Sequence, residues 1–418
     1  MPDLGDLCRV AVEAAEGDEA VEAYAEESRR TEASALRGEV EGLEFAEARG
    51  VGVRARENAA LAGADEHNVL PQPAPWEPIP ELFREASAQV PPERKTKLAL
   101  DLEARAISRD PHVTKIDEAQ VGDAVSRVAI ASTAGVEAEY QRTDAWCLAV
   151  TLAVDGDETQ TGFSFRIARG LDELEWEAVA DEAVERGARM LGATKPSTAR
   201  VPVVLDQFAA MSFLGVLAGA LSADAVQKGR SLFANLVGEQ VGSELFTLVD
   251  DGTTIEGPGA APFDDEGVPS GRTELFTGGM LNGFLHNAYT AHKGGTESTG
   301  NGKRGYRTPP SVGTSNFYLD AGTTSRSELL RLAGGGVLIQ DVSGVHSGAN
   351  PISGEFSVGA TGLRIVGGEP TEPLREMTIA STLPDMLHAI TGVGDDMRFF
   401  SSVGTPSVLI GEMTLAGV

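Results

Sequence analysis

The chain has 418 residues, of which 41% are hydrophobic, so it can bury a large core and we expect two domains. Its formal net charge is −29, with 63 Asp and Glu against 34 Lys and Arg. This balance argues against direct binding to nucleic acid or to an anionic membrane, because both require clustered Lys and Arg.

The basic residues are mostly Arg, since Lys occurs at only seven positions. A folded chain with so acidic a composition predicts adaptation to high salt, as in halophilic microorganisms, because salt screens the repulsion between like charges. Cys8 and Cys147 are too few for a disulfide framework or a thiolate zinc site, and they fit a reducing compartment. The start, MPDLGDLCRV, lacks the features of a signal peptide, so we expect a cytoplasmic protein.

Alternating apolar and polar residues from 23 to 56 predict a small antiparallel sheet of short strands. Turn signals within it are Arg37-Gly38 and Arg49-Gly50. Residues 70–92 are rich in Pro and predict a surface crossover. A second set of strands is expected over 123–168, with turns at the STAG sequence that begins at Ser132 and at Asp155-Gly156.

Residues 172–191 have apolar side chains at helical spacing, with Asp172 as the expected cap and Gly192 as the end of the helix. The next residues, ATKPSTARVP, form a plausible boundary. We therefore divide the chain into an N-terminal α+β domain, 1–194, and a C-terminal β-rich domain, 195–418.

Gly becomes frequent in the second half, where short apolar runs alternate with Gly-Gly turns. This pattern predicts a curved, barrel-like sheet with a few helices, and the chain as a whole is predicted to be α+β. Helices are expected near 208–226 and 383–390. The apolar run 208–221 is shorter than the roughly 20 residues of a membrane span, so we interpret it as a core helix.

Common catalytic and nucleotide-binding motifs are not supported. Gly300, Gly302 and Gly305 have the G-x-G-x-x-G spacing, but no strand precedes them and Pro309-Pro310 soon follows. The acidic runs 250–251 and 264–266 offer oxygen ligands for a cation, although solvated turn carboxylates are the favoured interpretation.

The six histidines include no pair at the helical spacing of a zinc-binding helix. A histidine metal site built from distant segments stays open as an alternative. His346 is singled out because it lies in the polar, Gly-rich run SGVHSGANPISGEFS, where a loop histidine bonded to nearby backbone is the other interpretation.

Three segments together resemble the TldD/PmbA family. They begin with KGRSLFANLVGEQ, APFDDEGVPSGRTELF and HSGANPISGEFSVGATG, and they occupy residues 228–253, 261–302 and 346–396. Their order and spacing make the resemblance specific from about residue 200 to the end, whereas the match at 38–55 is looser.

The resemblance implies a zinc motif, H-E-x-x-x-H, on a helix upstream of K-G-x-S in the catalytic TldD branch, with a Cys ligand near the C-terminus. Counting back from KGRS, the motif positions fall on Leu214, Gly215 and Gly219 of LGVLAG, none of which can bind zinc or act as a base. The C-terminal run FFSSVGTPSVLI has no Cys. We therefore expect no catalytic residue and no metal in this chain, which resembles the PmbA branch, also called TldE, and we expect LGVLAG to pack as core.

By this resemblance the chain is a cytoplasmic, non-catalytic subunit that forms a heterodimer with a TldD-type zinc subunit. The pair would cleave unfolded or extended peptides, with zinc held by the partner. A Gly-rich sheet edge suits such a substrate, because main-chain hydrogen bonds make little demand on sequence. The candidate residues for lining a shared cavity are Asp264, Asn301, Arg304, His346 and Asn350.

Two alternatives remain. The chain could be a stand-alone hydrolase with a site around His346, with or without a recruited metal. It could also be a peptide-binding modulator without enzymatic activity, as the family's historical label "modulator of DNA gyrase" suggests, acting through a protein partner.

The acidic composition generates the first testable prediction. The thermal midpoint of the purified chain should rise between low salt and molar KCl, because screening removes repulsion that the folded state concentrates. Calorimetry across a salt series measures this change. A midpoint that stays constant or falls over the series would refute adaptation to high salt.

Overall fold

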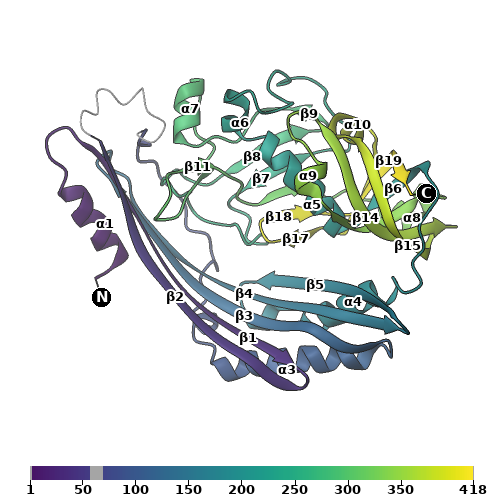
Figure 1. The fold of residues 1–418 in the computed structure, drawn as a ribbon. Coiled ribbons are helices and arrows are strands. Elements are labelled where there is room, and N and C mark those ends of the chain that lie inside the picture. Colours follow the sequence, from purple (N-terminus) through teal and green to yellow (C-terminus); the bar gives the residue numbers. More distant parts are fainter. Residues whose placement is uncertain (1, 57–68, 418) are drawn as a thin grey trace.

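The computed structural model describes residues 2–56 and 69–417 (Figure 1). The N-terminal part is built on one five-stranded antiparallel sheet with the strand order β2-β1-β3-β4-β5. The C-terminal part holds two six-stranded sheets and lies above the concave side of the first sheet in Figure 1. The predicted α+β class is confirmed.

The N-terminal sheet has long strands, and the expectation of short ones is wrong. β1 and β2 form one hairpin that turns at Arg37 and Gly38, whose φ values of 59° and 75° suit a tight hairpin turn. The strands are β1 (Ala20–Leu36), β2 (Glu39–Arg56), β3 (Val113–Ser132), β4 (Glu137–Asp155) and β5 (Glu158–Ala168).

Arg49-Gly50 is not a turn but lies inside β2, which corrects the sequence prediction. A Cβ atom at Gly50 would overlap the ring of Tyr306, and one at Gly52 would overlap the Tyr306 carbonyl group. The absence of a side chain at these glycines therefore lets a C-terminal loop approach the hairpin. They do not form a turn.

Helices pack on the convex face of this sheet (Figure 1). Two of them, α3 (Pro92–Arg109) and α4 (Trp176–Ala188), share a contact surface of small apolar residues, because β4 turns Ala145, Cys147, Ala149 and Ala153 toward them. Two of these helices, α1 and α3, were not predicted from the sequence. The helices are α1 (Leu4–Glu13), α2 (Glu85–Ala88), α3 (Pro92–Arg109) and α4 (Trp176–Ala188).

The predicted helix over 172–191 is present as α4, but its start differs. A short 3₁₀ turn, η2 (Leu171–Glu173), precedes it, and Glu175 is the N-cap without a side-chain hydrogen bond. Asp172 therefore does not cap the helix. It instead forms an ion pair with Arg94 of α3.

The C-terminal part contains a closed barrel, as predicted. Strands β15, β14, β13, β6 and β19 pair in that order, and a further β15–β19 pairing closes the ring. The six strands of this sheet are β6 (Ala199–Leu205), β13 (Val337–Ser343), β14 (Glu355–Val366), β15 (Glu369–Thr382), β16 (Ile390–Val393) and β19 (Val408–Ala416).

A second C-terminal sheet has the order β17-β18-β12-β7-β8-β9. Its strands are β17 (Arg398–Phe400), β18 (Val403–Thr405), β12 (Phe317–Leu319), β7 (Leu248–Asp251), β8 (Arg272–Thr277) and β9 (Met280–Leu281). A small hairpin, β10 (Gly302–Lys303) and β11 (Ser311–Val312), stands apart.

Six helices connect these strands. The predicted helix near 208–226 is split into α5 and α6, and the one near 383–390 is α10. The helices are α5 (Gln207–Ala220), α6 (Ala223–Gln227), α7 (Ala288–Gly294), α8 (Arg326–Ala333), α9 (Val345–Gly348) and α10 (Leu383–His388). Within the described ranges no helix combines the length and apolarity needed to cross a bilayer.

α4 approaches β5 closely at a pair of glycines. A Cβ atom at Gly162 of β5 would overlap the Ala183 carbonyl oxygen, and Thr151 donates a hydrogen bond to that oxygen at 2.8 Å. Gly187 of α4 lies opposite Gly162. The absence of both side chains therefore sets the distance between helix and sheet.

Gly162→Ala should lower the free energy of unfolding by about 1–3 kcal/mol, because the added methyl has no space without moving α4. Gly219→Ala in α5 is the matched control. A Cβ there meets nothing within 4 Å, so the gain in helix propensity should raise stability by up to about 1 kcal/mol. Urea titration measures both, and equal effects of the two changes would contradict this account of the contact.

Candidate functional site

α5 is fixed at its first residue by a buried ion pair. β6 ends at Leu205, and Asp206 then caps α5 by accepting a hydrogen bond from Ala209 N at 3.1 Å. Arg186 of α4 donates to Asp206 Oδ2 at 2.7 Å, and both side chains are more than nine-tenths buried. The pair therefore connects the N-terminal sheet's helix to the helix of the C-terminal core.

Gln340 of β13 completes this junction. Its Nε2 donates to the Arg186 carbonyl at 3.1 Å, Arg186 donates back to the Gln340 carbonyl, and Arg189 Nε donates to Gln340 Oε1 at 2.6 Å. Arg186 and Gln340 lie in regular elements, and Arg189 is the C-cap residue of α4. The position of α4 relative to β13 and α5 is thereby specified by polar contacts as well as by packing.

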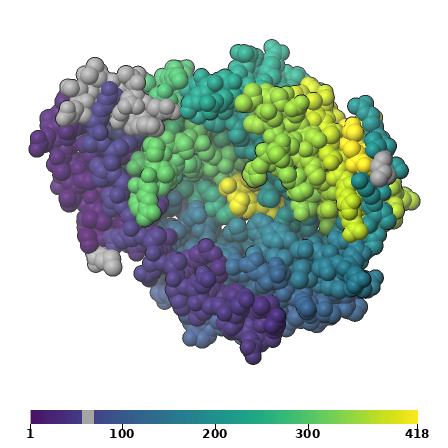
Figure 2. Space-filling view, in the orientation of Figure 1, coloured from purple at the N-terminus to yellow at the C-terminus, as the bar shows by residue number. Residues whose placement is uncertain are grey.

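A groove of about 440 Å³ opens beside this junction. One wall is β5, and the other is formed by α5, β13 and β14. Figure 2 shows the surface hollowed between the N-terminal sheet and the C-terminal part, with the yellow C-terminal strands in the hollow. The lining residues are Thr159, Gln160, Thr161, Phe163, Arg186, Met190, Phe208, Met211, Ser212, Gln340, Asp341 and Thr361.

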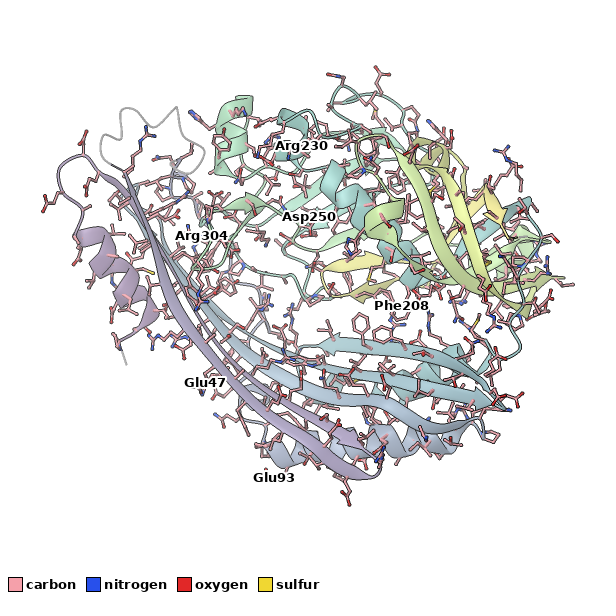
Figure 3. The ribbon with its side chains drawn as sticks, viewed as in Figure 1. Glu47, Glu93, Phe208, Arg230, Asp250 and Arg304 are labelled. Carbon is pink, nitrogen blue, oxygen red and sulfur yellow. The ribbon has the colours of Figure 1, made fainter. Side chains whose placement is uncertain are left out.

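Aromatic rings form one end of the groove. Phe208 lies 5.7 Å from Phe163 and 4.4 Å from Phe400 between ring centroids. The guanidinium groups of Arg186 and Arg398 stack on Phe208 at 4.3 and 5.1 Å. Figure 3 places Phe208 where β5 meets the C-terminal part. This combination offers an apolar surface held in place by two arginines, which are themselves paired with Asp206 and Glu182.

β5 supplies unpaired main chain to the groove. It is an edge strand, bonded in the sheet to β4 alone. At Phe165 the edge is capped, because Arg398 donates to its carbonyl at 2.8 Å. Thr159, Thr161 and Phe163 are exposed along the groove. An extended peptide could therefore add to this edge as a further strand.

The expected core packing of LGVLAG is only partly correct. Leu214 is 1% exposed and belongs to the core, but Gly215 and Gly219 lie one turn apart on the exposed side of α5. A Cβ at either glycine would meet nothing within 4 Å. The helix therefore has one open face without side chains.

The residues at these three positions do not fit a metal. Leucine and glycine side chains carry no imidazole, thiolate or carboxylate ligand. Elsewhere in the described part of the chain, no group of three or more His, Cys, Asp or Glu side chains is arranged to hold a metal ion. No chemical step through a metal bound to this chain can be derived from this site.

Two of the candidate residues from the sequence, Asp264 and Arg304, lie in a different place, a buried ion cluster between the β1–β2 hairpin and the C-terminal loops, and a third, Asn301, precedes Gly302, whose N–H binds Asp264. We define this cluster by its charged members Glu22, Arg54, Asp264, Asp265, Glu266 and Arg304. Figure 3 shows Arg304 near the hairpin, well away from Phe208.

The Arg304 side chain is bound by residues of this chain, although its buried Nε has no hydrogen-bond partner among the described residues. It pairs with Glu22 and stacks on Tyr24 at 4.9 Å, while Arg54 donates to both Glu22 oxygens at 2.7 and 2.9 Å. Arg54 also lies 3.5 Å from Glu266. The cluster thus fastens the hairpin to the C-terminal part.

Asp264 and Asn301 are also internal structural groups. Asp264 accepts backbone hydrogen bonds from Glu266, Val268 and Gly302 at 2.7–3.0 Å. Asn301 donates to Asp250 Oδ2 at 2.6 Å. The expectation that the acidic runs are solvated turns is wrong, because Asp250, Asp264 and Glu266 are at most 2% exposed.

His346 and Asn350 lie apart from the other three candidates. Both are exposed, His346 on α9 and Asn350 in the following loop, where its Oδ1 accepts from Ile352 N at 2.8 Å. Neither residue lines the groove. The role of all five candidates in a cavity shared with another subunit stays a prediction.

Comparison with known proteins then identifies the family. Residues 198–417 match the sequence profile of the PmbA/TldA metallopeptidase C-terminal domain, and residues 85–191 match that of the central domain. The chain belongs to the PmbA/TldD family.

Relatives of this PmbA/TldD chain are themselves described as metalloproteases. Metalloprotease PmbA of Escherichia coli O157:H7 is 27% identical over 341 residues, which cover 81% of this chain and 73% of the relative. A Thermotoga maritima structure described as a candidate modulator of DNA gyrase has a TM-score of 0.88 at 26% identity, covering 95% and 96% of the two chains. TldE of Thermococcus kodakarensis has the same fold, with a TM-score of 0.85 at 23% identity over 99% of each chain.

The groove itself was not anticipated from the sequence. Its residues come from five elements, and their types, such as Thr161, Met211 and Gln340, are common on surfaces and in cores. The one available signal was the apolar run that became α5, together with Asp206 immediately before it, which is a favoured N-cap residue.

Burial raises the pKa of Asp264 to about 7, and burial followed by repulsion from Asp264 raises the pKa of Glu266 to about 8. An unfolded Glu titrates near pH 4.3, so the folded chain retains protons that the unfolded chain has lost. This contribution to stability is full below about pH 4 and is lost as pH rises through about 8.

Glu266→Gln should therefore flatten the fall in thermal midpoint between pH 5 and pH 8.5, because glutamine cannot lose a proton. Glu93→Gln, at an exposed site on α3, is the control and should leave the slope unchanged. Differential scanning fluorimetry across the pH series gives the slopes. A wild-type midpoint that rises over this range would contradict the raised pKa values.

Proposed function

We propose that this chain is the non-catalytic subunit of a TldD/TldE-type peptidase that acts on unfolded or extended peptides in the cytoplasm. A TldD-type partner would bind the zinc and carry out the chemistry, and this chain would hold the substrate. The observation that carries the proposal is the open face of α5, where the positions of the family's zinc motif are Leu214, Gly215 and Gly219.

The groove supports a role in holding the peptide. Edge strand β5 offers main-chain groups, which bind an extended chain with little regard to its sequence. Phe208 and its neighbouring rings offer apolar contact for a side chain of the peptide, and Arg186 and Arg398 stack on Phe208 and fix its position. These features suit binding, since the groove's lining includes no histidine or cysteine.

Reconstitution tests the proposal. The chain purified alone should contain substoichiometric zinc and cleave no unfolded peptide, and cleavage should appear when a TldD-type subunit is added. Atomic absorption and a fluorogenic peptide assay measure the two quantities. Stoichiometric metal together with cleavage by the isolated chain would overturn the proposal and favour a stand-alone hydrolase.

The role of the groove is tested in the same assay. Thr161→Trp should fill the space between β5 and α5 and lower cleavage by the reconstituted pair, mainly by raising KM, because the peptide loses its place on the β5 edge. Gln141→Trp, at an exposed position of β4 outside the groove, is the matched control and should cleave like the wild type. Equal activity of both variants would show that peptides bind elsewhere.

A further inference from the structure

The second edge of the N-terminal sheet is long, and no other strand of the described residues pairs with it. β2 runs over 18 residues, Glu39–Arg56, and within the described part of the chain it pairs with β1 alone. Figure 1 shows it at the outer margin of the sheet. Natural edge strands are usually short, bulged or charged, and β2 is long and contains neither Lys nor Pro, although it carries Glu and Arg side chains.

Apolar side chains are exposed along one face of this strand. Leu43, Phe45, Val51 and Val53 are opposite Ala33, Thr31, Ala25 and Ala23 of β1, which share the helix-bearing face. Their exposed fractions are 40%, 63%, 37% and 54%. A row of exposed apolar residues beside unpaired backbone is characteristic of a strand that pairs with another chain.

We propose that β2 pairs antiparallel with β2 of a second copy of this chain, centred on Ala48, so that two five-stranded sheets become one of ten strands. The proposal concerns the chain by itself and does not depend on the function proposed above.

The register follows from the geometry of antiparallel pairing. Residues directly opposite each other orient their N–H and C=O groups alike, either both toward or both away from the other strand, and successive residues along β2 alternate between these two orientations. A symmetric pair must therefore be centred on a residue, not between two. Like charges opposite each other are destabilising, so a centre at Glu47 or Arg49 is disfavoured because it places that residue against its own copy.

Centring on Ala48 makes the strand complementary to itself. Glu47 then faces Arg49 of the other copy, so that opposite charges meet twice across the twofold axis. Phe45 faces Val51, and Leu43 faces Val53, so the exposed apolar residues cover one another. Centres at Ala46 or Gly50 instead place Phe45 against Glu47 or Arg49 against Val51.

The length of the match suits a specific interface. A bulge near the turn, where Ala35 pairs with Val40 but Ser34 pairs with Gly42, ends the regular part of the strand. The remaining stretch, residues 43–53, would form about 10–12 hydrogen bonds with its copy, since alternate opposite pairs exchange two each. A typical protein interface has about 10.

Cysteine cross-linking tests the register. Ala48→Cys places two thiols directly opposite across the axis, within disulfide reach, so mild oxidation should link two chains. Ala46→Cys is the matched control, because Ala46 is equally exposed on the same face of β2. Its two copies would lie four residues apart, about 14 Å, and should not link. Cys8 and Cys147 do not interfere, since both are buried.

Charge reversal tests the interface without cross-linking. Glu47→Arg alone and Arg49→Glu alone should each weaken self-association about tenfold or more in sedimentation equilibrium, because each creates like-charged pairs on both sides of the axis. A mixture of the two variants should associate, since each then offers the charge that the other lacks. Circular dichroism checks that both variants fold.

Three outcomes would overturn the proposal: a wild-type chain that is monomeric in molar KCl, equal cross-linking of the two cysteine variants, or dimers that survive both charge reversals. The first would show that the β2 edge stays unpaired when only this chain is present. The other two would assign self-association to a different surface. None of these results bears on zinc content or on cleavage with a TldD-type subunit, so the function proposed above is tested separately.

Discussion

The relation between the two parts of the molecule depends on the buried ion pair of Arg186 and Asp206. Asp206 both caps α5 and binds the arginine of α4, so one carboxylate determines where the helix begins and which helix lies beside it. Removing either partner would leave a buried charge unpaired, which typically costs about 3–5 kcal/mol. Because the groove is the space between β5 and α5, its width is set by this pair and by the glycine contact that holds α4 on β5.

The fold was largely accessible from the sequence where local signals and tertiary structure agree. Arg37-Gly38, Gly278-Gly279 and Gly367-Gly368 mark real chain reversals, since these residues adopt positive φ. Arg49-Gly50 carries the same local signal but serves a contact with Tyr306, which is 256 positions away in the chain. Local sequence cannot distinguish a glycine required by a turn from one required by a distant neighbour.

For the candidate site, the sequence predicted only that the zinc ligands are absent. The residues of α5 exclude a zinc helix from their chemistry alone, and no structure is needed for that step. The burial of Asp264 and Glu266 was predicted wrongly, because an acidic run in an acidic protein is usually solvated. These carboxylates are buried because Arg54, Gly302 and Ala288 contact them from three separate segments of the chain. Contacts between such distant segments cannot be predicted from residue spacing or composition.

The cap that Arg398 places on the Phe165 carbonyl affects how the molecule can assemble. A sheet with two equivalent open edges can add copies head to tail without limit, which produces filaments. Here the two edges differ, since β5 is partly blocked and recessed beside α5, whereas β2 pairs only with β1 among the described strands. Addition of β5 to the β2 of a neighbour is therefore disfavoured. Arg398 thus makes the two edges of the sheet inequivalent, and this difference favours closed assemblies over fibres.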